Sequence, residues 1–284
     1  IGIDVGGTFT DIVAVSEAGT VTFAKATSTP SDPSIGVMNA VERLADELGI
    51  SSKNLLSKTE SIVHGTTVAT NALLERKGAK TGLLTTLGHR DVLEMREGLK
   101  DDRYNMRLPA PDPLVPRYLR LGVRERIKPD GFVHTKLDVT SLDQAIEKLR
   151  QEEVTSVAVC YLHAYKEPKH EKETKKILEA KLPGVSVSLS SEVFPEIKEY
   201  ERVSTTIVNA YVRPIVENYL NRLEERLKNA GYKGAVLIIL SHGGVAPIEE
   251  AIRLSAATVL SGPAGGVAGS KSVSYTHLTL PTKA

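Results

Sequence analysis

Hydrophobic and polar positions follow two different spacings along this chain, and the two spacings alternate. Short apolar runs predict buried strands at residues 61–64, 81–85, 154–162, 185–189 and 235–240. Apolar residues that recur every three or four positions predict helices at residues 33–48, 65–77, 141–151, 168–182 and 196–230. Because strands and helices take turns, the pattern predicts an α/β fold with much parallel sheet.

Polar residues and prolines mark where several of these elements begin and end. Asp32 followed by Pro33 is typical of a helix start, and Ser141-Leu-Asp-Gln144 predicts a capping box. Pro214 interrupts the last helical stretch and is expected to kink or split it. Residues 98–135 contain several prolines and little helical period. We expect a long excursion there, packed on the core near a substrate or partner surface.

Residues 1–15 place a carboxylate, glycines and threonines into one turn between two apolar strands. Asp4 is expected to end the first strand, and Gly6-Gly7 to adopt positive φ values before the second strand begins near Asp11. Backbone amides around such a turn can surround an anion, with the hydroxyls of Thr8 and Thr10 as further donors. An aspartate at the strand end can hold Mg²⁺ beside a polyphosphate. The plainer interpretation is an ordinary glycine hairpin with a capping aspartate.

A second cluster of glycines lies at residues 260–269. Gly262, Gly265 and Gly266 would let the backbone approach a ligand, and a helix starting there would direct its first amides at negative charge. The cluster is not a Walker loop, since no Lys-Ser or Lys-Thr follows it, and it lacks the Rossmann spacing. Alone it predicts close helix packing as readily as an anion site. Together with the opening hairpin, it favours a nucleotide cleft.

The composition limits the classes of partner and location. The chain has 284 residues, enough for about two domains, and its 36 Lys and Arg residues nearly balance 35 Asp and Glu residues. No broad field therefore attracts nucleic acid or membranes. No apolar run approaches the roughly 20 residues of a transmembrane helix. The single cysteine, Cys160, fits a core position better than a nucleophile and agrees with a reducing, cytoplasmic location.

Several segments, in order along the chain, resemble the hydantoinase/oxoprolinase family of the actin, Hsp70 and sugar-kinase superfold. The sequence Asp-Val-Gly-Gly-Thr-Phe-Thr-Asp at residues 4–11 resembles the first phosphate motif of that superfold. Further segments similar to family landmarks lie at residues 64–76, 88–94, 113–117, 199–202 with 209–211, and 260–267. Such an ordered series is far more specific than one glycine turn.

The resemblance implies an actin-like (ribonuclease H-like) α/β fold, with a mixed sheet and flanking helices. The second half of that fold, with its second phosphate hairpin and adenosine motif, is not in this chain. The resemblance also implies an N-terminal family domain over residues 1–195 and the beginning of a core domain over residues 196–271. Residues 272–284 change in character and resemble translated adapter DNA, so we expect a non-native tail there, with a natural polar strand as the alternative.

The family's chemistry implies roles for individual residues. Asp4 and Asp11 are the expected catalytic carboxylates, and Asp4 is the expected ligand to Mg²⁺. The phosphates of ATP are expected on Gly6, Gly7, Thr8 and Thr10, with Gly262, Gly265 and Gly266 on the opposite wall. Candidates for substrate contact or coupling are His64, Thr66, Thr67, Arg90, Asp91, Glu201 and Arg202. A core role for His64, a solvated ion pair for Arg90-Asp91 and an exposed helix face for Glu201-Arg202 are the alternatives.

The resemblance implies an ATP-dependent cyclic-amide hydrolase acting on hydantoin or 5-oxoproline, which phosphorylates the amide oxygen before ring opening. An ATP-dependent ketone carboxylase subunit of the same family is one alternative, and a nucleotide-dependent scaffold or reactivase is another. Relatives commonly work with a second, hydantoinase B-like subunit, so a partner of that kind is expected. Because the second half of the superfold is missing, we expect this chain alone to bind nucleotide weakly and to be inactive.

Overall fold

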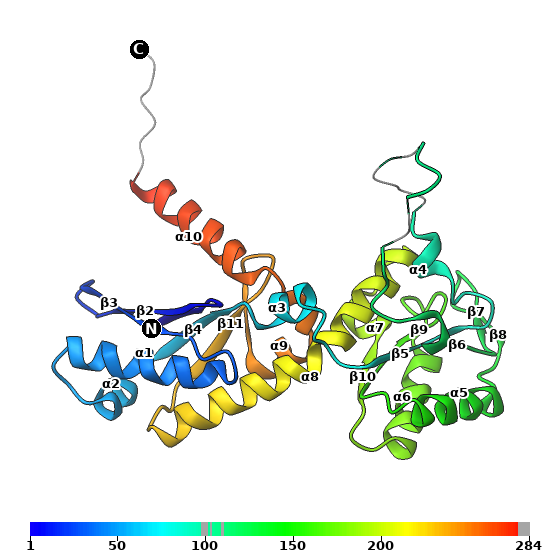
Figure 1. Cartoon of the computed structure of the whole chain (residues 1–284), viewed down its shortest axis with the longest axis horizontal. Helices are drawn as coiled ribbons and strands as arrows, with labels where there is room; N and C mark the ends of the chain where they lie inside the picture. The colour runs from blue at the N-terminus through cyan, green and yellow to red at the C-terminus, as the bar shows by residue number, and fades with distance from the viewer. Residues whose placement is uncertain (98–101, 103, 109–110, 278–284) are drawn as a thin grey trace, which may run out of the picture. The chain divides into compact units, whose positions relative to one another are not determined.

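The computed structural model describes residues 1–97, 102, 104–108 and 111–277. The chain divides into two compact units, each with its own sheet (Figure 1). The first unit comprises Ile1–Lys77 and Ile215–Ala284, and the second comprises Gly78–Pro214. The second unit is therefore inserted into the sequence of the first. The boundary expected near residue 195, between the family's N-terminal domain and its core domain, stays a prediction.

The first unit is built on a six-stranded mixed sheet with the order β12-β11-β4-β1-β2-β3. Its parallel centre consists of β1 (Gly2–Val5), β4 (Ser61–Thr66) and β11 (Ala235–Ile239). Antiparallel strands extend it on both sides: β2 (Phe9–Val15) and β3 (Val21–Thr27) beyond β1, and β12 (Val245–Pro247) beyond β11. The carboxyl ends of the parallel strands meet at one edge of the sheet, which is where such folds place ligands.

Helices from distant parts of the sequence flank this sheet. They are α1 (Pro33–Glu47), α2 (Ser52–Lys58), α3 (Val68–Leu74), the second half of α8 (Glu199–Asn229), α9 (Ile248–Arg253) and α10 (Ser261–His277), with a 3-10 turn η2 at Ser255–Thr258. Helix α1 begins as predicted, because Asp32 Oδ1 accepts hydrogen bonds from the amide and the hydroxyl of Ser34 at 3.2 and 2.6 Å. Its apolar face, with Val37 and Leu44 fully buried, packs on β2 and β3.

The second unit contains a four-stranded sheet with the order β10-β9-β5-β6, in which all neighbours are parallel. Its strands are β5 (Thr81–Thr86), β6 (Arg120–Val123), β9 (Ser156–Cys160) and β10 (Ser186–Leu189), and a separate antiparallel pair is formed by β7 (Arg126–Ile127) and β8 (Val133–Thr135). Its helices are α4 (Val92–Met95), η1 (Arg117–Leu119), α5 (Val139–Gln151), α6 (Lys169–Lys181), α7 (Ser190–Val193) and the first half of α8. The alternation of strands and helices therefore gives the parallel sheet that the sequence predicts.

Cys160 lies in the core of the second unit, as its apolar surroundings predict. Its side chain is buried at the end of β9, among residues of the hydrophobic core. Burial raises the pKa of the Cys160 thiol to about 12. The thiolate that a nucleophile needs is therefore not available at neutral pH.

The structure corrects the prediction for residues 98–135. Part of this stretch is an element of the core sheet, because β6 pairs with β5 in parallel, and β7 and β8 follow it. Strand β6 escaped the pattern analysis because its four residues, Arg-Leu-Gly-Val, show neither an apolar run nor a clear alternation. Residues 98–101, 103 and 109–110 lie outside the described residues.

One predicted helix start is wrong, and of the two outcomes predicted at Pro214, a kink or a split, the split does not occur. Helix α5 begins at Val139 with Asp138 as its N-cap, accepting from the Thr140 amide at 3.2 Å, so the Ser141 capping box does not form. The Ser141 hydroxyl instead donates to the Asp138 carbonyl at 2.9 Å. Helix α8 is not split, since it continues through Pro214. In the expected non-native tail, residues 272–277 continue helix α10, and residues 278–284 lie outside the described residues.

Candidate nucleotide site

The opening hairpin forms as predicted, but its glycines serve a different purpose. Strand β1 ends at Val5 and β2 begins at Phe9, and the Gly6 amide donates to the Phe9 carbonyl at 3.0 Å. Neither Gly6 nor Gly7 has the positive φ that the sequence predicts. A Cβ on Gly6 would instead lie 3.2 Å from the Phe9 carbonyl oxygen. Glycine is therefore favoured at this position by space rather than by conformation.

The turn presents backbone amides that other groups do not use. Within the described part of the chain, the amides of Gly7 and Thr8 have no hydrogen-bond partner. The Thr10 side chain, in contrast, is fully buried, and its hydroxyl lies 3.1 Å from the Ser28 hydroxyl, which donates to the Gly6 carbonyl at 2.8 Å. Thr10 thus supports the turn from inside, while Gly7 and Thr8 are the groups that can meet an anion.

Asp4 is the residue at which the two predicted glycine clusters come together. It pairs in register with Asp11 across the hairpin. A Cβ on Gly65 of β4 would lie 3.0 Å from Asp4 Oδ1, and a Cβ on Gly262 would lie 3.7 Å from the same atom. A side chain at residue 65 would crowd the Asp4 carboxylate, whereas one at residue 262 would make ordinary van der Waals contact with it. The hairpin and the residues around 262, far apart in sequence, form one site.

The start of helix α10 is held against this site by hydroxyl groups. The Leu260 amide donates to Thr70 Oγ1 at 2.9 Å, and the Ser261 hydroxyl donates to the Thr66 carbonyl at 3.2 Å. Leu260 itself has a φ of 58°, a conformation that costs free energy in a residue other than glycine. Strained backbone of this kind occurs at turns and at ligand sites.

The charges at the site suit a hydrated cation. Partial desolvation, followed by the nearby charge of Asp11, raises the pKa of the Asp4 carboxyl above its ordinary value. The Asp11 carboxylate is 3.0 Å from Lys25 Nζ at an exposed position. No group of three or more metal-ligating side chains occurs among the residues that the structure describes. One or two carboxylates that share an ion with phosphates and water are, however, the usual ligands of Mg²⁺, so Asp4 and Asp11 fit that ion.

The candidates at the end of β4 also belong to this unit. His64 is fully buried, with Nε2 2.7 Å from the Tyr219 hydroxyl, and burial lowers its pKa to about 4. His64 is therefore neutral at pH 7 and has the core position that was the alternative to a ligand contact. Thr67 Oγ1 donates to the Val5 carbonyl at 3.1 Å, and Thr66 Oγ1 accepts from the amide of Val68 at 3.2 Å. Both threonines fix the connection between β4 and α3 beside the hairpin.

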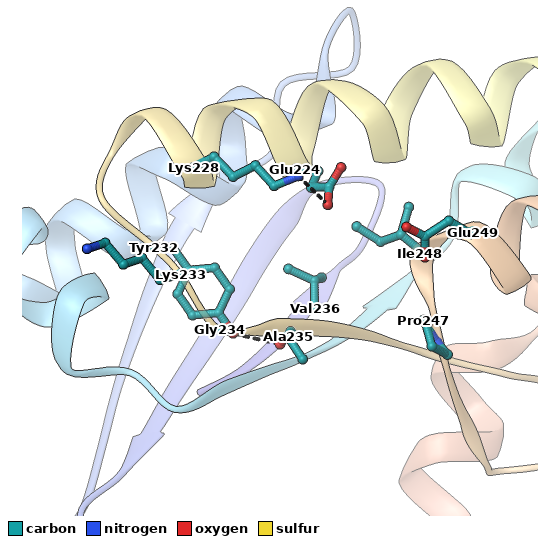
Figure 2. A pocket seen from close by; sticks show the side chains of 10 residues that line it. All are labelled: Glu224, Lys228, Tyr232, Lys233, Gly234, Ala235, Val236, Pro247, Ile248 and Glu249. Carbon is teal, nitrogen blue, oxygen red and sulfur yellow. Dashed lines mark hydrogen bonds and ion pairs between the residues drawn. The ribbon is translucent and has the colours of Figure 1, made fainter.

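A pocket of about 590 Å³, which we call the hairpin pocket, adjoins the turn. Gly6 and Gly7 line it, together with the β3–α1 loop (28–33), α3 and its C-terminal end, and the second half of α8. Asp4 lines a different hollow, of about 750 Å³, with Asp11, Lys25 and Ile239. A third pocket lies between α8, β11 and the start of α9 (Figure 2). Two contacts lie within it, Glu224 with Lys228 at 2.7 Å and the Tyr232 hydroxyl with the Ala235 carbonyl at 2.6 Å, and its lining contains no predicted site residue.

The four remaining candidates lie in the second unit, where each has a structural partner. Arg117 donates to both oxygens of Asp91 at 2.9 Å and holds the pKa of that carboxyl below its usual range, while Arg90 is 3.9 Å away. Glu201 is 2.9 Å from Lys198. Arg202 is buried and donates to the Tyr161 carbonyl at 2.8 Å. These contacts agree with the ion-pair alternative for Asp91, and the burial of Arg202 contradicts the exposed helix face expected for it.

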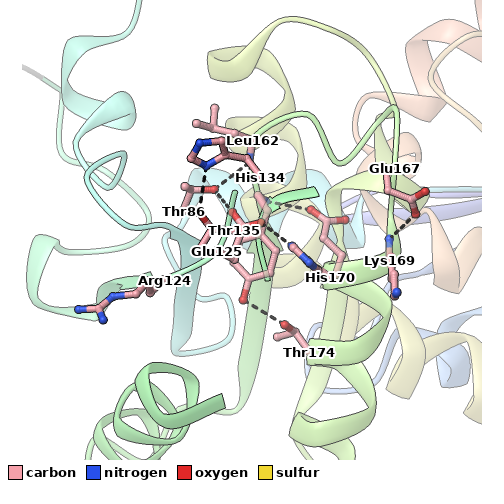
Figure 3. A network of polar contacts seen from close by, with 12 residues as sticks. Thr86, Arg124, Glu125, His134, Thr135, Leu162, Glu167, Lys169, His170 and Thr174 are labelled. Atoms are coloured by element: carbon pink, nitrogen blue, oxygen red, sulfur yellow. Dashed lines mark hydrogen bonds and ion pairs between the residues drawn. The ribbon is translucent and has the colours of Figure 1, made fainter. Parts of the chain in front are cut away.

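The sequence analysis missed a buried polar network in the second unit. Glu125 accepts from the Thr86 hydroxyl, and its other oxygen lies 2.8 Å from His170 Nδ1 (Figure 3). Thr86 also accepts from the Leu162 amide at 3.0 Å, so the network joins the ends of β5 and β9 to α6. Glu125 and His170 are both buried. The sequence around them gives no signal of burial, because Glu125 lies between Arg124 and Arg126 and His170 lies between Lys169 and Glu171.

Comparison with known proteins agrees with this architecture. Residues 1–182 match the model for the hydantoinase/oxoprolinase N-terminal region, and residues 202–279 match the hydantoinase/oxoprolinase model. The chain belongs to the hydantoinase/oxoprolinase family. It is 39% identical over 266 residues to the caprolactamase subunit alpha of Pseudomonas jessenii, covering 93% of this chain and 38% of that protein.

Two solved structures of family enzymes share the fold. The crystal structure of the ATP-dependent caprolactamase from Pseudomonas jessenii matches with a TM-score of 0.87 at 36% identity, over 98% of this chain and 41% of that one. The nucleotide-free structure of acetone carboxylase, from work on ATP-dependent acetone carboxylation, matches with a TM-score of 0.88 at 30% identity, over 97% and 40% of the two chains. These matches confirm the expected actin-like α/β fold.

The same comparisons set the scope of the functional statement. The chain spans about two fifths of the length of these relatives. ATP-dependent enzymes are found on both the lactam and the ketone branches of the family, so ATP use is a property of its relatives. The caprolactamase match is named as a subunit. No helix in the described ranges combines the length and the apolar character needed to span a membrane.

Proposed function

We propose that the parent of this chain is an ATP-dependent cyclic-amide hydrolase, in which the hairpin at residues 4–11 holds the phosphates of ATP. The observation that carries the proposal is the convergence of Asp4, the unpartnered amides of Gly7 and Thr8, and Gly262 at one edge of the sheet. The similarity to the caprolactamase subunit supports a lactam as the substrate. Hydantoin and 5-oxoproline are the other cyclic amides that the family's name suggests.

The chemistry follows from the low reactivity of an amide. Resonance delocalises the nitrogen lone pair into the carbonyl, which makes its carbon a poor electrophile. Transfer of the γ-phosphoryl group to the amide oxygen breaks the bond to the β-phosphate, forms an O–P bond and releases ADP. Water can then add to the activated carbon, and the ring opens when the C–N bond breaks and the protonated amine leaves, which gives an acyl phosphate. A second water hydrolyses this acyl phosphate to the carboxylate and inorganic phosphate. Such a transfer depends on positioning and charge neutralisation more than on covalent help from the protein.

Each group of the site has a role in that scheme. The amides of Gly7 and Thr8 donate to phosphate oxygens, and the start of α10 contributes its dipole from the Gly262 side. Asp4, assisted by Asp11, holds Mg²⁺, which when bound neutralises phosphate charge. Thr10 and Ser28 keep the turn in shape from below. Thr66 and Thr67 hold β4 and α3 against the hairpin.

An ATP-dependent ketone carboxylase subunit is the second candidate, favoured by the match to acetone carboxylase. Activation of an oxygen by phosphorylation would serve both reactions, and the hairpin does not distinguish them. In either case we propose a second, hydantoinase B-like subunit as partner. We also propose that the chain of 284 residues by itself turns over no substrate, because it spans about two fifths of the length of the relatives with named activities.

The test is substitution of Asp4 in the full-length parent. Asp4→Asn should weaken Mg·ATP binding in calorimetry and lower substrate-dependent ATP hydrolysis by about 10²–10³-fold, the usual cost of losing one group that stabilises developing charge. Asp46→Asn, an exposed position on α1, is the matched control. Assays with ε-caprolactam, hydantoin, 5-oxoproline, and acetone with bicarbonate separate the two reactions. Unchanged Mg·ATP binding in Asp4→Asn would contradict the proposal, and no stimulation by any small molecule would favour a scaffold.

A further inference from the structure

The hairpin pocket opens beside the turn that carries the candidate phosphate site. In β1, neighbouring side chains point to opposite faces of the sheet, so Asp4 lines one hollow and Val5 lines the hairpin pocket. Gly6 and Gly7 at the turn border the hairpin pocket directly. A phosphoryl group held at the turn and a molecule in this pocket would therefore meet at these two glycines, as phosphoryl transfer requires.

We infer that the hairpin pocket binds the acceptor, and that the acceptor is a neutral cyclic amide. This inference rests on the proposed function and adds to it the place and the charge of the substrate. The volume of about 590 Å³ lies in the range of small-molecule sites and leaves ample room for a ring of five to seven atoms.

The charges of the pocket favour a neutral occupant. Its charged lining residues, Asp32, Glu75, Lys77 and Arg222, sum to zero. The Glu75 carboxylate is 2.6 Å from Lys77 Nζ. The Asp32 carboxylate is 3.8 Å from the Arg222 guanidinium and 3.0 Å from that of Arg226, which does not line the pocket. A substrate carboxylate would have to compete with Asp32 for Arg222, whereas an uncharged ring needs no counter-charge.

The polar groups that remain match an amide. A lactam presents one N–H donor and one carbonyl acceptor on the same edge, and a carboxamide side chain offers the complementary pair. Asn71 donates one N–H to Thr67 Oγ1 at 3.2 Å, which keeps its orientation fixed and leaves its oxygen and its second N–H for a ligand. Asn218 on α8 adds a second carboxamide to the lining. Val68, Ala72 and Ile215 supply apolar surface for the methylene groups of the ring.

The experiment measures KM separately for the two substrates of the full-length parent, using δ-valerolactam and Mg·ATP. Asn71→Ala and Asn218→Ala should each raise the KM for δ-valerolactam by about three- to tenfold, which is the cost of one hydrogen bond. The KM for ATP should stay within about twofold of its value in the unmodified parent. Asn221→Ala is the matched control, because Asn221 is exposed on the same helix and does not line the pocket. If Asn71→Ala lowers the melting temperature, Asn218→Ala on the exposed helix surface carries the test.

Three outcomes would overturn the inference while leaving the proposed function in place. The first is an unchanged KM for lactam in both asparagine variants with normal Mg·ATP binding. The second is a rise in the KM for ATP rather than for lactam, which would make the pocket part of the nucleotide site. The third is a preference for 5-oxoproline over δ-valerolactam that Arg222→Gln abolishes, which would show recognition of a carboxylate. Loss of the proposed function itself would appear instead as absent Mg·ATP binding in the unmodified parent.

Discussion

The two units handle polar groups at the ends of their strands in opposite ways. In the first unit, the carboxyl end of the parallel strands β1 and β4 carries Asp4 and the amides of Gly7 and Thr8. Among the described residues, these groups have no hydrogen-bond partner in the protein. In the second unit, the equivalent edge carries Thr86 and Glu125, which are buried and bonded to each other and to His170. Unsatisfied polar groups that remain accessible can bind a ligand, whereas satisfied buried ones stabilise the fold.

The comparison also separates two uses of glycine. Gly6, Gly65 and Gly262 lie where a backbone or carboxylate atom of the site comes close. Gly78 in the second unit makes room for the ring of Tyr211, whose nearest atom would be 2.0 Å from a Cβ. The first set shapes a binding surface, and the second permits packing. In these four positions, polar neighbours accompany the candidate site and an aromatic neighbour accompanies packing.

The largest expected effect concerns the buried network of the second unit. Glu125→Ala leaves Thr86 and His170 without their partner in the core, and should cost about 3–5 kcal/mol of unfolding free energy. Native-state hydrogen exchange should show the loss in β5 and β9, with β1 and β4 unaffected. Glu173→Ala, an exposed position on α6, is the control and should stay within about 0.5 kcal/mol. Equal loss of protection in both units would refute the separation drawn here.

The next effect is a pH dependence of the first unit. His64 has a pKa lowered to about 4 when folded, so the unfolded chain binds more protons between pH 6.5 and 4. Its contribution to stability is present above pH 6.5 and is lost as the pH falls towards 4, by about 3 kcal/mol in total. Urea titrations at several pH values give the unfolding free energy at each pH. This free energy should depend less steeply on pH for His64→Gln than for the unmodified chain.

A smaller effect tests whether the second glycine cluster serves binding. Gly266 lies inside α10, has no atom within 4 Å of a Cβ position and has no left-handed φ. Gly266→Ala should stabilise the helix by about 0.5–1 kcal/mol. If Gly266 lines the phosphate site, the same variant of the full-length parent should bind Mg·ATP more weakly in calorimetry. Gly234→Ala is the contrasting variant, because its Cβ would lie 2.3 Å from the Glu60 carbonyl and should destabilise the chain.

The smallest expected effect is the destabilisation of the fold by the charged Asp4 carboxylate. The pKa of Asp4 is raised, so the folded chain binds this proton more tightly than the unfolded chain does. The charged carboxylate therefore destabilises the fold increasingly as the pH rises above the ordinary value of 3.8. Asp4→Asn should therefore melt slightly higher than the unmodified chain at pH 7, with the difference vanishing below pH 3.8. A lower melting temperature for Asp4→Asn at pH 7 would mean that the carboxylate stabilises the unit.

Local signals in the sequence predict most of the helices and strands and the hairpin side of the candidate nucleotide site. The buried run of β9, the Asp32 cap of α1 and the opening hairpin all depend on neighbouring residues, so pattern and capping rules predict them. The positive φ predicted for Gly6 and Gly7 was wrong because crowding by the Phe9 carbonyl, not turn type, favours glycine at residue 6. Strand β6 was missed because four residues carry too little pattern.

What the sequence by itself determined is the alternation of strands and helices, the hairpin with its carboxylate, and the family to which the chain belongs. Only the tertiary structure decided that Gly65 and Gly262 flank Asp4, that Glu125 pairs with His170, and that the second unit interrupts the first. The reason is physical: propensity and capping act over a few residues, whereas these contacts depend on which strands become neighbours in a sheet. That order is set by the burial of the whole apolar surface at once.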